Sequence, residues 1–371
     1  MMQAAIAISP VLAELAAAFP DASSSQIQYI YTVSSLASIV SILAVGRLAQ
    51  IVNNRVLAVI GIALIAVGGL LPVFVHSSLV LLYIASFIIG IGSGVANVMS
   101  ATLISQHFTG ITKGTVMGYQ SAFLSIGAMI MSVVSGQLAG HFAWHTAFLT
   151  YLLAIPVLIV VFIFLPSDLS PGSDSSETED SAQTRSGMNG RAWFFVILSF
   201  FSSALMNTFL SSISMFLSES GLGDASVAGT VSSMFLLLGI PAGILLGKVM
   251  KLLGRNLMWC MSLLMAVALV LVFAAKSLPI VYVAAVLFGI GYAIRNPAAI
   301  TFVSGMVDNK TVPVAVSLNQ GLSALGMFCT PLIVNTLSGL FGGGSRGAFL
   351  IAAIGMAVMA ALYLFANPIK K

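Results

Sequence analysis

The chain is a succession of long apolar runs separated by short polar segments. Each run has at least 18 residues, and a helix of that length, rising about 1.5 Å per residue, can cross a hydrocarbon core about 30 Å thick. The runs lie at about 2–19, 27–48, 56–75, 79–105, 114–139, 145–165, 192–216, 226–247, 256–275, 279–304, 313–338 and 347–366. We therefore expect an all-α polytopic membrane protein with twelve transmembrane helices.

Few charged residues interrupt these runs. Asp, Glu, Lys and Arg together make up 6% of the chain, whereas soluble domains carry about a quarter. This excludes a water-soluble fold and makes the lipid bilayer the surrounding medium. The first run has no basic residues ahead of it, so we interpret it as a span rather than a cleaved secretory signal.

Basic residues predict the orientation, because cytoplasmic loops collect Lys and Arg. With the amino terminus inside, eleven of the 14 fall on the cytoplasmic side. They are Arg47, Arg55, Lys113, Arg185, Arg191, Lys248, Lys251, Arg255, Lys310, Lys370 and Lys371. We expect a plasma-membrane protein, acting as a monomer, with both termini cytoplasmic. The net charge of +4 then reflects orientation, and we expect no nucleic-acid partner.

A polar, acidic, Ser-rich tract at 167–190 separates two halves of similar pattern. Its composition is typical of a flexible linker. Thr32–Ser35 returns as Thr230–Ser233, and Asn97 is matched by Asn296, about 200 residues later in each case. We therefore expect two six-helix bundles, at 1–166 and 191–371, joined by a cytoplasmic linker.

A glycine-basic loop follows the second and the eighth run. The copies begin Gly46-Arg47 and Gly247-Lys248 and end with Arg55 and with Gly254-Arg255. This arrangement resembles the major facilitator superfamily, and the resemblance covers essentially the whole chain. The acidic residue of the family's loop is replaced here by Gln50 and Lys251. The resemblance implies an alternating-access transporter whose substrate site lies between the halves near the membrane midplane.

One permanent cation, Arg295, lies deep inside the run at 279–304. It is roughly 14 Å from the predicted cytoplasmic end of that helix, which is too far for comfortable snorkelling to water. An ionisable residue at such depth indicates a functional site. The alternative is a structural arginine that is hydrogen-bonded to backbone carbonyls.

The family's fold implies that the first, fourth, seventh and tenth helices line the cavity. Polar residues on three of these helices are candidate substrate ligands. They are Ser93 and Asn97 on the fourth helix, Asn207 on the seventh, and Tyr292, Arg295 and Asn296 on the tenth. The serines equally suit close helix packing. The small residues of the fifth helix, including Ser132 and Gly136, predict such a packing seam.

Proton coupling requires a group whose ionisation changes. Glu14 is the only acidic residue within a predicted span, about 9 Å from the outer end of the first helix. It is our candidate coupling group, with an interfacial hydrated Glu as the alternative. Ser86 stands where proton-coupled exporters of the family often have a basic residue, and Met131–Gly136 departs from the antiporter pattern, which lowers the expectation of drug:proton antiport.

We predict a secondary active or facilitative transporter for a small organic anion, with Arg295 as its carboxylate partner. One alternative is an exporter of drugs or amphipathic metabolites, suggested by the 18 Met and 23 Phe. Another is a transporter-like sensor that moves nothing. The sequence has no phosphate loop, metal-spaced cluster or nucleophile beside a base, so we expect no enzyme, no cofactor and no metal.

Overall fold

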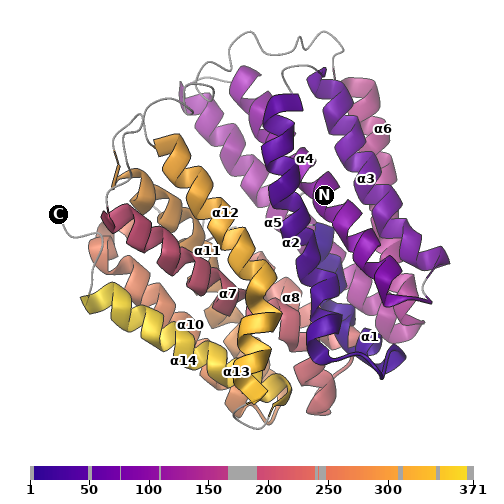
Figure 1. The fold of residues 1–371 in the computed structure, drawn as a ribbon, viewed down its shortest axis with the longest axis vertical. Coiled ribbons are helices and arrows are strands. Elements are labelled where there is room, and N and C mark those ends of the chain that lie inside the picture. Colours follow the sequence, from indigo (N-terminus) through magenta and orange to yellow (C-terminus); the bar gives the residue numbers. More distant parts are fainter. Residues whose placement is uncertain are drawn as a thin grey trace. The chain divides into compact units, whose positions relative to one another are not determined.

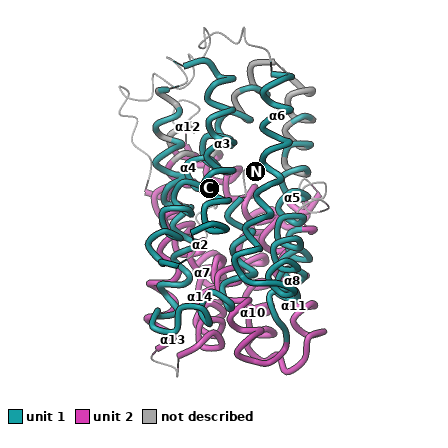
Figure 2. The backbone as a smooth tube through the Cα atoms, turned by 90° about the vertical axis from the view of Figure 1, so that its right-hand side faces the viewer, with its two compact units in different colours: residues 1–173, 223–236 teal, residues 174–222, 237–371 magenta. Residues whose placement is uncertain are grey.

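A computed structural model describes residues 4–48, 52–75, 77–107, 110–165, 190–238, 241, 248–307, 312–339 and 343–365. The described residues form helices and turns, with no strand among them (Figure 1). They divide into two compact units, residues 1–173 with 223–236 and residues 174–222 with 237–371 (Figure 2). The expected all-α membrane fold is confirmed.

In unit 1, α4 packs against both α2 and α3, α5 packs against η1 and η2, and α3 packs against η2 and α6. Its elements are η1 (Ala4–Val11), α1 (Leu12–Ala18), α2 (Ser24–Leu48), α3 (Asn54–Phe74), α4 (Leu79–His107), α5 (Gly110–His141), η2 (Trp144–Leu153), α6 (Ala154–Phe164) and most of α8 (Ala225–Leu237).

Unit 2 is held together by α10 against α14 and α11, and by α7 against α12 and α14. Its elements are α7 (Gly190–Glu219), η4 (Gly254–Asn256), α10 (Leu257–Ala274), α11 (Leu278–Ser304), α12 (Val312–Thr330), the π-helix η5 (Pro331–Asn335), α13 (Thr336–Gly339) and α14 (Gly344–Phe365).

Every predicted span coincides with a helix in the described part of the chain. Nine of these helices are long and apolar enough to cross a membrane, and two shorter apolar helices, Ala4–Ala18 and Ala225–Leu237, lie at the first predicted span and at the start of the eighth. The second predicted span is the 25-residue helix α2. The total of twelve spans stays a prediction.

Local sequence explains several helix boundaries. The side chain of Asn53 accepts a hydrogen bond from the backbone N–H of Arg55 at 2.8 Å and so caps α3. Pro279 occupies the first turn of α11, where a missing N–H costs nothing. Pro331 begins the π-helical segment after α12, since proline cannot donate the hydrogen bond that would continue the α-helix.

Helix α8 comes after the expected linker, yet its residues up to Leu236 lie in unit 1. It meets α5 where two glycines face each other. A Cβ on Gly229 would lie 2.7 Å from the carbonyl oxygen of Ser132, and one on Gly136 would lie 2.5 Å from that of Ala225. The Ser132 hydroxyl also donates to the Gly229 carbonyl at 3.3 Å. The small residues of α5 thus form the packing seam that the sequence predicted.

Segment 167–189 lies outside the described residues, and Gly190 is the first residue of α7. The expected division into bundles 1–166 and 191–371 therefore stays a prediction. The two compact units differ from the expected bundles in the placement of 223–236. The contact of α8 with α5, and that of Ala225 with Glu14 described below, attach this segment to unit 1.

Candidate functional site

Arg295 lies in the interior of unit 2, with 1% of its surface exposed. Its Nη1–H donates to the thioether sulfur of Met206 on α7 at 3.2 Å, and its Nη2–H donates to the hydroxyl of Tyr363 on α14 at 3.2 Å. The guanidinium carbon also stands 5.7 Å from the centre of the Tyr363 ring. Phe195 packs edge-on against that ring from α7. Three helices therefore hold the guanidinium.

The partners of Arg295 are all neutral. Nε has no hydrogen-bond partner among the described residues, and no carboxylate in the described part of the chain pairs with this cation. Burying an unpaired charge inside a protein destabilises the folded state by several kcal/mol. A cation–π contact offsets only about 0.5–2 kcal/mol of this cost. The site can therefore stabilise an anion, and Nε–H is a donor that remains to be used.

Sequence reasoning missed both direct partners of Arg295. Met206 and Tyr363 are apolar or amphipathic residues inside apolar runs, and such residues ordinarily serve packing. Met206 and Tyr363 contact Arg295 although they lie 89 and 68 residues away from it in the sequence. No local pattern of spacing carries that information.

Tyr292 and Asn296 form a separate pair on α11. Their side chains hydrogen-bond each other, one helical turn apart. Tyr292 is half-buried and Asn296 is exposed. Since Arg295 is buried and the next residue is exposed, the two lie on different faces of the helix. The structure thus does not join this pair to Arg295.

Asn207 is buried on α7 and joins that helix to α12. Its Nδ2 donates to the carbonyl of Met327 at 3.1 Å and to the hydroxyl of Thr330 at 3.3 Å. The Thr330 hydroxyl in turn donates to the carbonyl of Ala204 at 3.0 Å. The Oδ1 of Asn207 is buried without a partner among the described residues. Asn207 is thus a structural link with one unused acceptor.

On α4, Ser93 is buried and Asn97 is exposed. The Ser93 hydroxyl has no partner among the described residues. The same helix approaches α2 closely at Gly90, where a Cβ would lie 2.3 Å from the carbonyl oxygen of Ser34. On α4, the candidate Ser93 therefore lies near a close contact with α2, whereas the amide of Asn97 is exposed.

Glu14 lies in α1 of unit 1, close to the first residue of α8. Its Oε1 accepts a hydrogen bond from the backbone N–H of Ala225 at 3.0 Å. Its Oε2 is buried and has no partner in the described structure. The negative charge of Asp224 acts on the same carboxyl group. Sequence reasoning selected Glu14 as an acid in a span but missed its partner, which lies 211 residues away.

The glycine-basic loops are only partly described. Gly46 and Arg47 lie near the end of α2, but the side chain of Arg47 is outside the described structure, as is Gly247. Arg55 donates from Nη2 to the carbonyl of Phe162 and stands 5.2 Å from the centre of that ring. Lys248 and Arg255 are exposed, and Gly254 adopts a φ of +49°, a conformation that favours glycine. Arg55 therefore ties α3 to α6.

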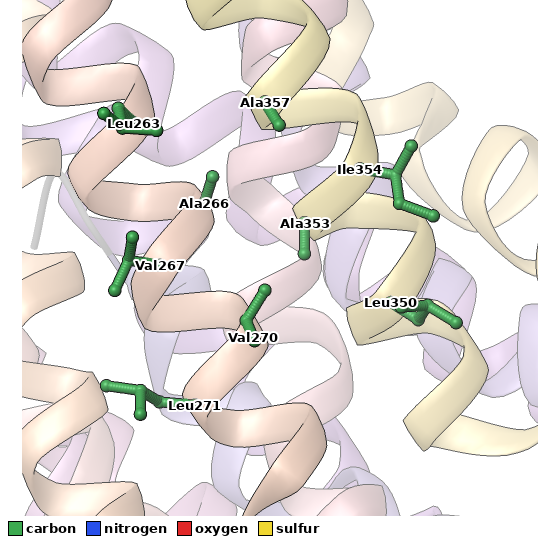
Figure 3. A pocket seen from close by; sticks show the side chains of 9 residues that line it. All are labelled: Leu263, Ala266, Val267, Val270, Leu271, Leu350, Ala353, Ile354 and Ala357. Atoms are coloured by element: carbon green, nitrogen blue, oxygen red, sulfur yellow. The ribbon is translucent and has the colours of Figure 1, made fainter.

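A shallow groove of about 340 Å³ lies between α10 and α14 (Figure 3). Its lining is entirely aliphatic: Leu263, Ala266, Val267, Val270, Leu271, Leu350, Ala353, Ile354 and Ala357. None of the candidate ligands is among these residues. Without a polar group in its lining, this groove cannot orient a polar substrate.

Among the described residues, no group of three or more His, Cys, Asp or Glu lies together as metal ligands would. Cys260 on α10 and Cys329 on α12 are free thiols, and each is partly buried. Of the candidate residues, Arg295, Asn207, Ser93 and Glu14 have buried polar atoms that lack a hydrogen-bond partner in the described structure.

Comparison with known proteins places the fold. The family model of the Major Facilitator Superfamily matches residues 1–273 and 195–371. The crystal structure of a D-xylose–proton symporter is similar to this chain with a TM-score of 0.75 and 15% sequence identity, over 97% of this chain and 93% of that one. At this identity the likeness concerns the fold alone. Since the family model spans essentially the whole sequence, the chain belongs to the Major Facilitator Superfamily.

Proposed function

We propose that this membrane transporter carries a small organic anion by alternating access, with Arg295 as the partner of the substrate carboxylate. The observation that supports the proposal is the burial of this guanidinium among neutral partners. A planar guanidinium offers a carboxylate two parallel hydrogen bonds, which are strongest where water is scarce. The bound anion would supply the charge that the described neighbours of Arg295 lack.

Five further residues would orient the substrate in this proposal. Asn207 supplies a buried acceptor, and Tyr292 with Asn296 supplies a polar pair on α11. Ser93 and Asn97 supply a hydroxyl and an amide on α4. On the orientation suggested by the basic residues, both termini lie in the cytoplasm at the plasma membrane. We also propose that the transporter acts as a monomer.

Sugar transport is a second candidate, because the D-xylose–proton symporter has a similar fold. A sugar would engage the amides and hydroxyls through neutral hydrogen bonds, and it would not need Arg295. Export of amphipathic compounds and a sensor without transport also remain as alternatives. In these cases Arg295 would serve only to join α7, α11 and α14.

Ligand-dependent thermal unfolding of the purified protein distinguishes these candidates. We expect lactate, succinate or benzoate to raise the unfolding midpoint, because a ligand that binds only the folded state stabilises it. Arg295→Ala should weaken anion binding by about 2–4 kcal/mol, and Arg295→Lys should recover only part of this loss. Arg346→Ala is the matched control, since Arg346 also stands over an aromatic ring, that of Phe216, but is exposed.

A midpoint raised by D-xylose and by none of the carboxylates would contradict the anion proposal. So would anion binding of normal strength by Arg295→Ala. Counterflow of the bound ligand in proteoliposomes then separates a transporter from a sensor, because a sensor binds its ligand without moving it.

A further inference from the structure

The aliphatic groove between α10 and α14 has a floor of alanines and walls of larger side chains (Figure 3). Ala266 and Ala353 are buried, with 4% and 2% of their surfaces exposed. Leu263, Val267 and Ile354 are 44%, 46% and 49% exposed. The small residues thus leave a depression that faces away from the protein. In a membrane-spanning chain, an apolar surface that faces outward meets the tails of lipids.

The groove has nearly the length of one lipid leaflet. Its lining on α10 runs from Leu263 to Leu271, which is about 12 Å of helix. One leaflet contributes about 15 Å to the hydrocarbon core. Leu271 lies close to the end of α10 at Ala274, so the groove belongs to the half of the membrane at this end of the helix. On the predicted orientation this half is the outer leaflet.

Two basic residues stand at the outer end of the groove. Arg346 precedes the lining residue Leu350 by about one helical turn and so lies on the same face of α14. Its Nη2–H donates to the carbonyl of Ala275, the residue after α10, at 3.4 Å. Lys276 follows directly, and both basic side chains are exposed. The side chain of Arg346 therefore reaches from α14 to the end of α10, where the groove ends.

These two cations depart from the charge pattern of the chain. Eleven of the 14 basic residues fall on the predicted cytoplasmic side and Arg295 falls inside the membrane, which leaves Lys276 and Arg346 outside. In the described part of unit 2, the acidic residue at this end is Glu219, whose two oxygens both accept from Ser345 at 3.0 Å. An ionised phosphate would complement the two cations, because arginine binds phosphate through two parallel hydrogen bonds.

We propose that this groove binds one anionic phospholipid, with an acyl chain between α10 and α14 and the phosphate at Arg346 and Lys276. The headgroup region begins at the surface of the core and is about 5–8 Å deep. Arg346 lies about 6 Å beyond Leu350 along α14, which is the level of a phosphate. Each basic residue near the surface strengthens the attraction of an anionic lipid about fivefold. The lipid would join α10 to α14 at a site separate from Arg295.

Quenching of fluorescence by brominated lipids tests occupancy at the groove itself. The reporter is Val267→Trp, in the wall of the groove, in the full chain with Trp144, Trp193 and Trp259 replaced by Phe. The protein is placed in vesicles that mix phosphatidylglycerol with phosphatidylcholine in varied proportions. Bromine is carried by the acyl chains of one lipid or of the other. The two series give the affinity of the groove for phosphatidylglycerol relative to phosphatidylcholine.

The matched control reporter is Val67→Trp on α3. Val67 is 61% exposed and precedes the last residue of its helix, Phe74, by the same distance as Val267 precedes Ala274. The two valines are related by the internal repeat, and no Lys or Arg lies between residue 55 and Lys113. The control therefore reports an outward-facing position of equal predicted depth without a nearby basic residue in the sequence.

We expect phosphatidylglycerol to bind about tenfold more tightly than phosphatidylcholine at Val267→Trp, and equally at Val67→Trp. Combining Val267→Trp with Lys276→Gln and Arg346→Gln should reduce the preference to about onefold. Equal affinity for the two lipids at Val267→Trp would overturn the proposal. So would a preference that survives the loss of both cations.

A second pair of substitutions controls for the change in net charge. Lys248→Gln with Arg255→Gln removes two exposed cations that precede α10, at the opposite end of the same predicted span. The preference at Val267→Trp should remain about tenfold in this protein. A loss as large as that from Lys276→Gln with Arg346→Gln would show that net charge, and not this groove, selects the lipid.

Native mass spectrometry of the unmodified chain keeps the test decisive if the tryptophan variants fail to insert. We expect one phosphatidylglycerol to be retained in preference to phosphatidylcholine, and to be lost in Lys276→Gln with Arg346→Gln. A mass of two chains without lipid would identify a second copy as the occupant and overturn the proposal. Neither measurement uses a substrate, so failure of the anion proposal at Arg295 leaves this result unaffected.

Discussion

At the scale of single residues, Arg295 is the largest fully buried side chain in the described chain. Its contacts with a thioether and a phenol leave the positive charge without compensation. The protein without ligand therefore carries a cost at this position that an anion would remove. If the proposed anion binds here, the site trades stability for binding, as functional sites commonly do.

Replacing the cation with an apolar side chain tests that trade. We expect Arg295→Met to raise the free energy of unfolding by about 1 kcal/mol in the absence of ligand, because a buried charge is replaced by a packed hydrophobe. The same variant should lose the stabilisation by carboxylates. Thermal unfolding with and without succinate measures both effects. A large loss of stability in Arg295→Met would instead identify Arg295 as a structural residue.

Tyr363→Phe removes the phenol that accepts from Arg295 and keeps the ring beneath the guanidinium. We expect the free energy of unfolding to fall by about 1–3 kcal/mol, because a second buried donor of the cation is left without a partner. Tyr119→Phe is the control, since Tyr119 is 62% exposed on α5. Equal unfolding midpoints for the two variants would show that the phenol contributes nothing.

At the scale of elements, α7 and α12 are joined by a polar link, while α5 and α8 are joined by a glycine contact. The first link ends at Thr330, directly before the π-helix η5. Here the hydroxyl satisfies both the amide of Asn207 and the carbonyl of Ala204. Hydrogen bonds of this kind between membrane helices are worth about 0.6–2 kcal/mol.

Thr330→Val deletes that hydroxyl at nearly constant volume. We expect it to lower the free energy of unfolding by about 1–3 kcal/mol, since the buried amide of Asn207 loses an acceptor. Thr301→Val is the matched control, because the exposed Thr301 hydroxyl only bonds back to the carbonyl of Pro297 on its own helix. If both variants unfold alike, the link between α7 and α12 is not a source of stability.

The glycine contact can be tested in the same manner. Gly229→Ala should destabilise the protein by about 1–3 kcal/mol, since the added methyl group meets the backbone of α5. At Gly127, on α5, an added Cβ meets nothing within 4 Å. There we expect Gly127→Ala to be neutral or stabilising, by up to about 1 kcal/mol, through helix propensity alone. The opposite order of unfolding midpoints would mean that α5 and α8 are not in close contact.

At the scale of the whole molecule, hydropathy predicted the helices because a membrane admits few other structures. Each apolar run contains a helix in the described part of the chain, and the internal repeat indicated the family. The partners of Arg295 and Glu14 were not predictable, because Met206, Tyr363 and Ala225 have no distinctive local pattern. The placement of 223–236 in unit 1 also depends on tertiary contacts rather than on order along the chain.

That placement has a consequence for split proteins. Residues 1–169 and 188–371 produced as separate chains should assemble, because the sequence of the omitted tract is polar and acidic. Residues 1–169 alone should be less stable, since Gly136 and Ser132 then lose α8. Co-purification from detergent and the unfolding midpoint of each sample measure this. Recovery of no assembled protein would show that the linker is required.

The burial of Arg295 also bears on how the chain is made. Insertion of an arginine at the centre of a helix costs about 2.5–3.5 kcal/mol. During synthesis Met206 has already been made when α11 emerges, whereas Tyr363 follows 68 residues later. The nascent α11 must therefore enter the bilayer with only one of the two final hydrogen bonds of its guanidinium. Ribosome-bound chains that end before α14 should leave α11 poorly inserted, and completion of the last helix should secure it.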